Sequence, residues 1–201
     1  MREVRIFLLF LLVGVKMKEK ILNCLEQNPV IATVKGGNFK SALNSPAKVL
    51  FMMSSNILTL KDRIKEAHEN GKFVFVHVDL ADGLGKDKYG LKFLQDAGVD
   101  GILSTKTPLI KNAKEMGILA VQRFFVYDSQ GACNVDEVIT STHPDIIEIM
   151  PGVIDKITKR FSAYNIPLIA GGFVETKNEV TSALKNGAFA VSTTKEELWY
   201  I

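Results

Sequence analysis

The sequence predicts an α/β fold, a closed and compact (β/α)8 barrel with short loops. Short apolar, β-branched runs alternate with stretches of helical periodicity along the chain. Four of the helical stretches end in glycine just before the next apolar run. The first turn reads Lys35-Gly36-Gly37-Asn38, without the GxGxxG pattern that opens many doubly wound sheets. The closed barrel is therefore favoured over an open doubly wound sheet.

Eight strands are expected, each a near-continuous hydrophobic run that is typical of parallel strands covered on both faces. In chain order they are Val30–Lys35, Lys48–Met53, Phe73–Asp79, Gly101–Thr105, Leu119–Val126, Ile146–Met150, Pro167–Gly171 and Ala188–Thr193.

Helical periodicity occupies the intervals between most of these strands. The predicted helices are Leu58–Asn70, Asp87–Ala97, Pro108–Met116, Val135–Thr140, Val153–Tyr164 and Thr176–Asn186. Glycines at 71, 98, 117 and 187 supply the left-handed residue that ends many helices. Thr176 and Glu179 form a capping box at the start of the last of these helices.

The first sixteen residues differ from the remainder of the chain. The apolar run Ile6–Val15 is too short to cross a bilayer as a helix, which takes about 20 residues. It resembles the apolar core of a signal peptide, but no small-residue cleavage site follows. A start codon chosen too far upstream would also account for the run, as would an apolar extension packed on the domain. We expect residues 1–16 to be an N-terminal extension and residues 17–201 to form a single barrel domain.

Composition and charge narrow the class of protein. With 47% hydrophobic and 23% charged residues among 201, the chain is neither disordered nor fibrous. A net charge of +3 permits nucleic-acid binding without indicating it. The two cysteines, Cys24 and Cys133, have no CxxC or paired-histidine context, which argues against a zinc site and fits a cytoplasmic location. No metal, cofactor or membrane is expected.

Polar residues gather where the predicted strands end, and a barrel builds its ligand site from those ends. The candidate ligand-binding residues are Lys35, His77, Asp79, Ser104, Lys106, Gln122, Arg123 and Glu148. Strand alternation puts His77 and Asp79 on the face of Phe75. Because lone buried charges are costly, we expect four of these residues to neutralise one another around a small polar ligand: Lys35, Asp79, Arg123 and Glu148.

The strongest local signal pairs Gly171-Gly172 with Ser192-Thr193, after the seventh and eighth strands. Loops at these positions commonly bind phosphate, through glycine backbone N–H groups and a helix N-terminus. We expect a phosphate site formed by Gly171, Gly172, Ser192 and Thr193. The alternative is that the glycines only make a tight turn and the hydroxyls only cap a helix.

Single residues at the strand ends leave alternatives open. His77 is either a general base or a hydrogen-bonded core group. Lys35 is either a Schiff-base lysine or an ion-pair or phosphate partner. Asp79 and Asp82 alone make a poor metal cage.

Several blocks, taken in order from about Val30 to the C-terminus, resemble the glycerol-3-phosphate-responsive transcription antiterminator family. They are 75–84 (FVHVDLADGL), 101–105 (GILST), 121–129 (VQRFFVYDS), 144–152 (PDIIEIMPG), 169–173 (IAGGF) and the closing Leu198-Trp199. Lys106-Thr107 stands where the family usually has Arg-Ser, which keeps the charge but loses the bidentate geometry.

The resemblance implies a (β/α)8 barrel that senses glycerol 3-phosphate and binds the leader mRNA of glycerol-utilisation operons, so that transcription reads through a terminator. It implies a regulator, not a catalyst, that could form a homo-oligomer. The alternative is a phosphosugar enzyme (an isomerase, aldolase or synthase) acting on a triose-phosphate-like substrate, because fold alone does not decide function.

Overall fold

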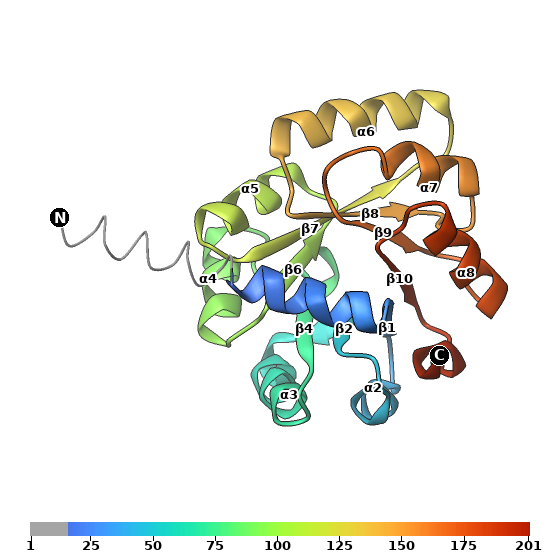
Figure 1. The fold of residues 1–201 in the computed structure, drawn as a ribbon. Coiled ribbons are helices and arrows are strands. Elements are labelled where there is room, and N and C mark those ends of the chain that lie inside the picture. The colour runs from blue at the N-terminus through green and yellow to red at the C-terminus, as the bar shows by residue number, and fades with distance from the viewer. Residues whose placement is uncertain (1–15) are drawn as a thin grey trace.

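The computed structural model describes residues 16–201 and shows a closed barrel of eight parallel strands (Figure 1). Each strand is hydrogen-bonded to the next barrel strand along the chain, and the last strand closes on the first. The predicted fold class is confirmed. The strands are β1 (Val30–Val34), β2 (Val49–Met52), β4 (Phe73–His77), β6 (Gly101–Ser104), β7 (Leu119–Phe125), β8 (Ile146–Met150), β9 (Leu168–Gly171) and β10 (Ala190–Thr193).

Helices surround the barrel, and small elements cover its carboxyl end. The helices are α2 (Phe39–Asn44), α3 (Ile57–Glu69), α4 (Lys88–Asp96), α5 (Thr107–Glu115), α6 (Ser129–Thr142), α7 (Asp155–Phe161) and α8 (Lys177–Lys185). The smaller elements are the 3-10 helices η1 (Val78–Leu80) and η2 (Glu196–Tyr200) and the paired strands β3 (Ser55–Asn56) and β5 (Ala81–Asp82). Within the described residues, no helix is long and apolar enough to cross a membrane.

All eight predicted strands are present, with ends that differ by one or two residues. The predicted capping box at Thr176 is formed. Glycines 71, 98, 117 and 187 have φ of 68°, 84°, 72° and 94°, as expected of residues that end helices in the left-handed region.

Two predicted elements were wrong in extent. The helix predicted over Val135–Thr140 begins at Ser129, because the Asp128 carboxylate accepts a hydrogen bond from the Gly131 N–H at 2.7 Å and caps it. The strand predicted to reach Asp79 ends at His77, where the chain turns into η1. Asp79 therefore does not follow the strand alternation on which its placement depended.

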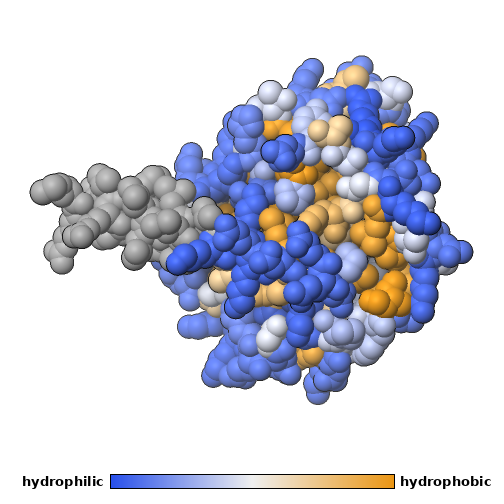
Figure 2. Space-filling model, in the orientation of Figure 1, coloured by the Kyte–Doolittle hydropathy of each residue, from blue (hydrophilic) through white to orange (hydrophobic). Residues whose placement is uncertain are grey.

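A helix over residues 16–27 closes the amino end of the barrel (Figure 1). Its Ile21 and Leu25 are buried against Ile31, Phe51 and other inward-facing side chains of the strands. Figure 2, in the same view, shows hydrophilic side chains interspersed with hydrophobic ones on this face. The expected extension lies, except for Lys16, outside the described residues. Because one end of the barrel is sealed with apolar side chains, access to its interior is from the carboxyl end.

Candidate functional site

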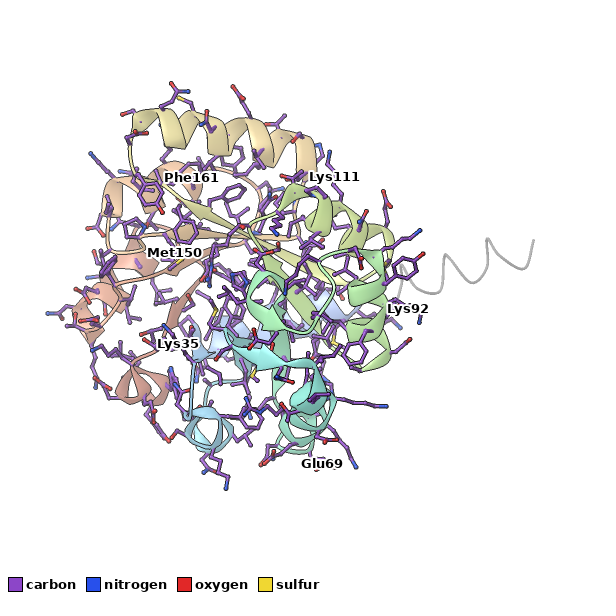
Figure 3. The ribbon with its side chains drawn as sticks, turned by 180° about the vertical axis from the view of Figure 1, so that it is seen from behind. Lys35, Glu69, Lys92, Lys111, Met150 and Phe161 are labelled. Carbon is purple, nitrogen blue, oxygen red and sulfur yellow. The ribbon has the colours of Figure 1, made fainter. Side chains whose placement is uncertain are left out.

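A cavity of about 230 Å³ opens at the carboxyl end of the strands. Figure 3 views the molecule from behind, with Lys35 and Met150 labelled near the middle of the barrel. The lining combines polar side chains, backbone and a few apolar groups from β1, β2, β7, β8 and the loops after β9 and β10: Thr33, Lys35, Met53, Leu80, Arg123, Met150, Gly172, Phe173, Val174, Glu175, Ser192, Thr193 and Thr194. Its size suits a ligand smaller than a drug-sized molecule.

A buried ion pair between two strands forms the floor of this cavity, and a hydroxyl from a third strand donates to it. Arg123 on β7 donates from Nε to Glu148 Oε2 at 2.5 Å, and the Ser192 hydroxyl on β10 donates to Glu148 Oε1 at 2.5 Å. Arg123 is 6% exposed and Glu148 is fully buried. Both carboxylate oxygens are therefore occupied, and Glu148 holds the guanidinium at the cavity floor instead of facing a ligand.

His77, at the end of β4, is buried close to this ion pair. Burial, and next the positive charge of Arg123, lower the pKa of His77 to about 4. The imidazole is therefore neutral at physiological pH. Its Nδ1 is buried and has no hydrogen-bond partner among residues 16–201, which is uncommon for a buried polar atom.

Asp79 joins the ends of two strands and does not line the cavity. Its Oδ1 accepts from the Ser104 hydroxyl at 2.8 Å, and its Oδ2 accepts from the Thr105 N–H and hydroxyl at 2.8 and 2.9 Å. Burial alone would raise the pKa of Asp79, but these hydrogen bonds outweigh it and lower the pKa. Asp79 and Ser104 thus fix the η1 turn against the end of β6.

Of the eight predicted ligand-binding residues only Lys35 and Arg123 line the cavity, and Gln122 and Lys106 point elsewhere. Gln122 points out of the barrel, where it accepts from Thr142 Oγ1 at 2.7 Å and donates to Thr107 Oγ1 at 3.4 Å. Its neighbour Arg123 points inward, so alternation turns Gln122 toward the helices. Lys106 is exposed at the start of α5 and does not line the cavity. The structure therefore corrects the prediction that Gln122 faces inward and the prediction that Lys106 belongs to the ligand-binding cluster.

The loop after β9 bends through two successive left-handed residues, Gly172 with φ 76° and Phe173 with φ 59°. In the described part of the chain, no group accepts a hydrogen bond from the N–H of Gly172, Phe173, Val174 or Thr194. Successive backbone N–H groups in such a loop form a concavity that attracts anions. A side chain on Gly171 would come within 2.6 Å of Glu148 and Ser192, so glycine is required there.

The predicted hydroxyl donors are already engaged. Ser192 donates to Glu148, and Thr193 Oγ1 donates to the Val174 carbonyl at 2.7 Å. Both residues line the cavity, but their protons are directed elsewhere. An anion would therefore be held by backbone N–H groups.

Sequence reasoning missed part of the lining. Thr33 follows Ile31 in the inward-facing register of β1 and could have been found from alternation. Met53, Met150 and Phe173 carry no polar signal that distinguishes them from core residues.

Lys35 and Arg123 bring positive charge to the cavity. Arg123 is neutralised by Glu148, whereas Lys35 is exposed and forms no ion pair with any residue that the structure describes. Glu175, the acidic residue of the lining, pairs with Lys195 at 3.5 Å. Lys35 is therefore left as an unpaired cation beside the loop of free N–H groups.

Comparison with known proteins gives consistent matches across the barrel. The family described as "Glycerol-3-phosphate responsive antiterminator" matches residues 30–199. The crystal structure of a glycerol uptake operon antiterminator regulatory protein from Listeria monocytogenes is 33% identical with a TM-score of 0.81, and covers 86% of this chain and 95% of its own. A glycerol uptake operon antiterminator-related protein from Thermotoga maritima is 34% identical with a TM-score of 0.77, and covers 85% and 96%.

Two further comparisons concern a protein similar in sequence and proteins that are similar in fold alone. The uncharacterized protein YgcP of Escherichia coli (strain K12) is 35% identical over 185 residues, which is 89% of this chain and 95% of that protein. Barrel aldolases are also similar in structure, such as the deoxyribose phosphate aldolase of Aeropyrum pernix at 11% identity and a TM-score of 0.64, covering 94% of each chain. At that identity the likeness shows the fold alone.

Proposed function

The chain belongs to the glycerol-3-phosphate responsive antiterminator family, and from this premise we propose that it binds glycerol 3-phosphate in the cavity and leader mRNA on its surface. It is a regulator of glycerol operons in the manner of its antiterminator relatives. In this proposal it acts in the cytoplasm, where effector binding favours a conformation that permits read-through of a terminator.

The observation that carries the proposal is the loop after β9. Gly172, Phe173 and Val174, whose N–H groups have no acceptor among the described residues, line the same cavity as Lys35 and Arg123. Backbone donors and nearby cations are the groups that hold a phosphate dianion. In this proposal the phosphate occupies this loop, with Gly172 allowing its close approach.

The glycerol end of the effector extends toward the cavity floor. Thr33 is 7% exposed and lines the cavity, so its hydroxyl is in reach of a small polyol. Arg123, oriented by Glu148, presents its remaining N–H groups from the same floor. These groups are the specificity end of the proposed site, in place of the Asp79 and Gln122 contacts that the sequence predicted.

Leader RNA and effector must be coupled for the protein to act as a sensor. An effector shifts a conformational equilibrium only if it binds one state better than the other. Coupling is reciprocal, so glycerol 3-phosphate and leader RNA each tighten binding of the other by the same factor, typically about 5–150-fold.

The test compares two valine variants of left-handed glycines. At Gly172 an added Cβ would come within 2.6 Å of Met150 Cε in the phosphate loop, whereas at Gly98, with φ 84°, it would meet nothing within 4 Å. Both substitutions strain the backbone, but only Gly172→Val is at the site. We expect Gly172→Val to weaken glycerol 3-phosphate binding more than tenfold in calorimetry, and Gly98→Val to leave it unchanged.

The same proteins are then titrated with glycerol-operon leader RNA at zero and saturating glycerol 3-phosphate, at fixed salt. The parent and Gly98→Val gain RNA affinity with the effector, and Gly172→Val loses that gain. Unchanged effector affinity in Gly172→Val overturns the phosphate site. Equal RNA affinity of the parent in both conditions overturns the sensor, and turnover of triose phosphates would then favour the enzyme.

A further inference from the structure

We propose that a second cavity, between the β7–α6 loop and α7, receives an unpaired base of single-stranded RNA that stacks on Tyr127. The inference rests on the proposed function and names the surface that RNA would contact. The cavity has a volume of about 410 Å³ and is lined by Val126, Tyr127, Asp128, Ser129, Ala132, Ile154, Lys156, Ile157 and Arg160. It shares no lining residue with the first cavity.

The most unusual feature at this second cavity is a pair of exposed aromatic rings, of which Tyr127 belongs to the lining. Tyr127 is 85% exposed and Phe125 is 44% exposed. The two rings are stacked, with centroids 6.0 Å apart and planes only 7° from parallel. Phe125 thus holds one face of Tyr127 in a fixed orientation. Single-stranded RNA is bound chiefly by stacking unpaired bases on aromatic side chains of this kind.

Basic side chains line the same cavity. Arg160 pairs with Asp136 at 2.5 Å, and Asp136 also accepts from the Tyr164 hydroxyl at 2.7 Å, so the guanidinium is held in place. Lys156 is exposed, and no acidic residue of the described chain forms an ion pair with it. The carboxylate of Asp128 is engaged as the cap of α6. A stacked base would therefore have one unpaired cation, Lys156, beside its phosphates.

The chain segment 150–154 borders both cavities. Met150 lines the first cavity, and its carbonyl accepts from the Val126 N–H at 2.8 Å, next to Tyr127. Gly152 N–H donates to the Gly171 carbonyl at 2.6 Å, directly before the proposed phosphate loop. Ile154 then lines the second cavity. A phosphate that orders the loop after β9 can in this way bias the position of the base-stacking surface.

These observations favour RNA over a protein partner. Aliphatic side chains line part of the cavity, but its exposed ring, Tyr127, stacks on Phe125, and the lining also includes Lys156, which pairs with no carboxylate of the described chain. The aromatic and basic combination is the one that single-stranded nucleic acids use.

The experiment compares two exposed tyrosines. Tyr127→Ala removes the stacking ring, Tyr127→Phe keeps it, and Tyr89→Ala removes a ring that is 73% exposed beside a different cavity, between α4 and α5. Binding of labelled leader RNA is followed by fluorescence anisotropy. We expect Tyr127→Ala to weaken RNA binding about 5- to 150-fold, while Tyr127→Phe and Tyr89→Ala stay within twofold of the parent. Glycerol 3-phosphate affinity of the free protein is unchanged in all three variants.

A second probe separates this inference from the proposed function. Oligoadenylate and an abasic strand of the same length carry the same phosphate charge, but only the first can stack. If the leader fails to bind, the proposed function fails; a preference for oligoadenylate over the abasic strand that Tyr127→Ala abolishes would still support the site. Equal effects of Tyr127→Ala and Tyr89→Ala, absence of any preference, or a change of oligomeric state in Tyr127→Ala without loss of RNA binding would overturn it.

Discussion

The amino-end and carboxyl-end halves of the barrel interior are built from the same strands but are lined by different kinds of side chain. On five of the eight strands the inward residue toward the amino end is apolar and the one two positions later is polar: Ile31 and Thr33, Phe75 and His77, Val121 and Arg123, Ile146 and Glu148, Ala190 and Ser192. Two residues advance a strand by about 7 Å. The apolar layer at the amino end and the polar layer available for binding are therefore adjacent layers on the same strands.

The two layers differ in how their groups are satisfied. Ile21 and Leu25 cover the apolar layer, whose side chains have no hydrogen-bonding groups to pair. In the polar layer hydrogen bonds join Arg123 and Ser192 to Glu148, whereas His77 Nδ1 and the nearby N–H groups after β9 are without partners in the part of the chain that the structure describes. The apolar layer and the buried ion pair both stabilise the fold, whereas the residues with unpaired N–H groups after β9 line the cavity that a ligand can reach.

The largest expected effect comes from breaking the buried ion pair. Glu148→Leu leaves Arg123 buried without its counter-ion, and we expect the free energy of unfolding to fall by about 3–5 kcal/mol. In the double variant Arg123→Met, Glu148→Leu the uncompensated charge is gone, so most of the loss is recovered. Urea unfolding of the parent, both single variants and the double variant measures this cycle. A double variant no more stable than Glu148→Leu would contradict the comparison.

A somewhat smaller effect is expected in the apolar layer. Ile21 is fully buried under the barrel, and Ile21→Ala should lower the free energy of unfolding by about 3 kcal/mol, within the range for buried isoleucine truncation. Glu26, exposed on the same helix, is the matched control, because Glu26→Ala should change stability by less than about 0.5 kcal/mol. Equal stabilities of the two variants, measured by urea unfolding, would show that the helix over residues 16–27 does not seal the barrel.

Periodicity predicted the fold because every barrel strand is covered on both sides, which leaves an uninterrupted apolar run in the sequence. It could not predict which polar residues near the carboxyl end of a strand face inward. Gln122 and Arg123 are adjacent and both polar, and only the register of β7 separates the residue packed against α5 and α6 from the one at the cavity floor. Asp79 was misplaced because η1 begins directly after His77.

The loop that we propose for phosphate was singled out from its glycines, but the N–H groups proposed to bind the anion were not. The proton of Ser192 is directed to Glu148 and that of Thr193 to the Val174 carbonyl. Those partners are 44 and 19 residues away in the sequence, and no local pattern shows such a contact. Phe173, with its left-handed backbone, was missed for a related reason: this conformation is rare for a residue with a bulky side chain.

The smallest expected effect is a dependence of the free energy of unfolding on pH, which comes from the polar layer alone. The folded-state pKa of His77 is lowered to about 4 from 6.5, so the unfolded chain takes up a proton first as the pH falls. The stability that neutral His77 contributes is complete above pH 6.5 and is lost progressively between pH 6.5 and 4. Between pH 7.5 and 5 this loss amounts to about 2 kcal/mol, before the carboxylates with lowered pKa begin to titrate. We expect this loss of stability to be absent in His77→Phe, and also in His77→Gln, which adds no apolar ring. His143→Asn, a change at an exposed histidine, should retain the loss. Ile21→Ala keeps the full pH dependence at lower stability. Urea unfolding at the two pH values gives the slope for each protein, and a parent whose stability is the same at both would place His77 outside the buried polar layer.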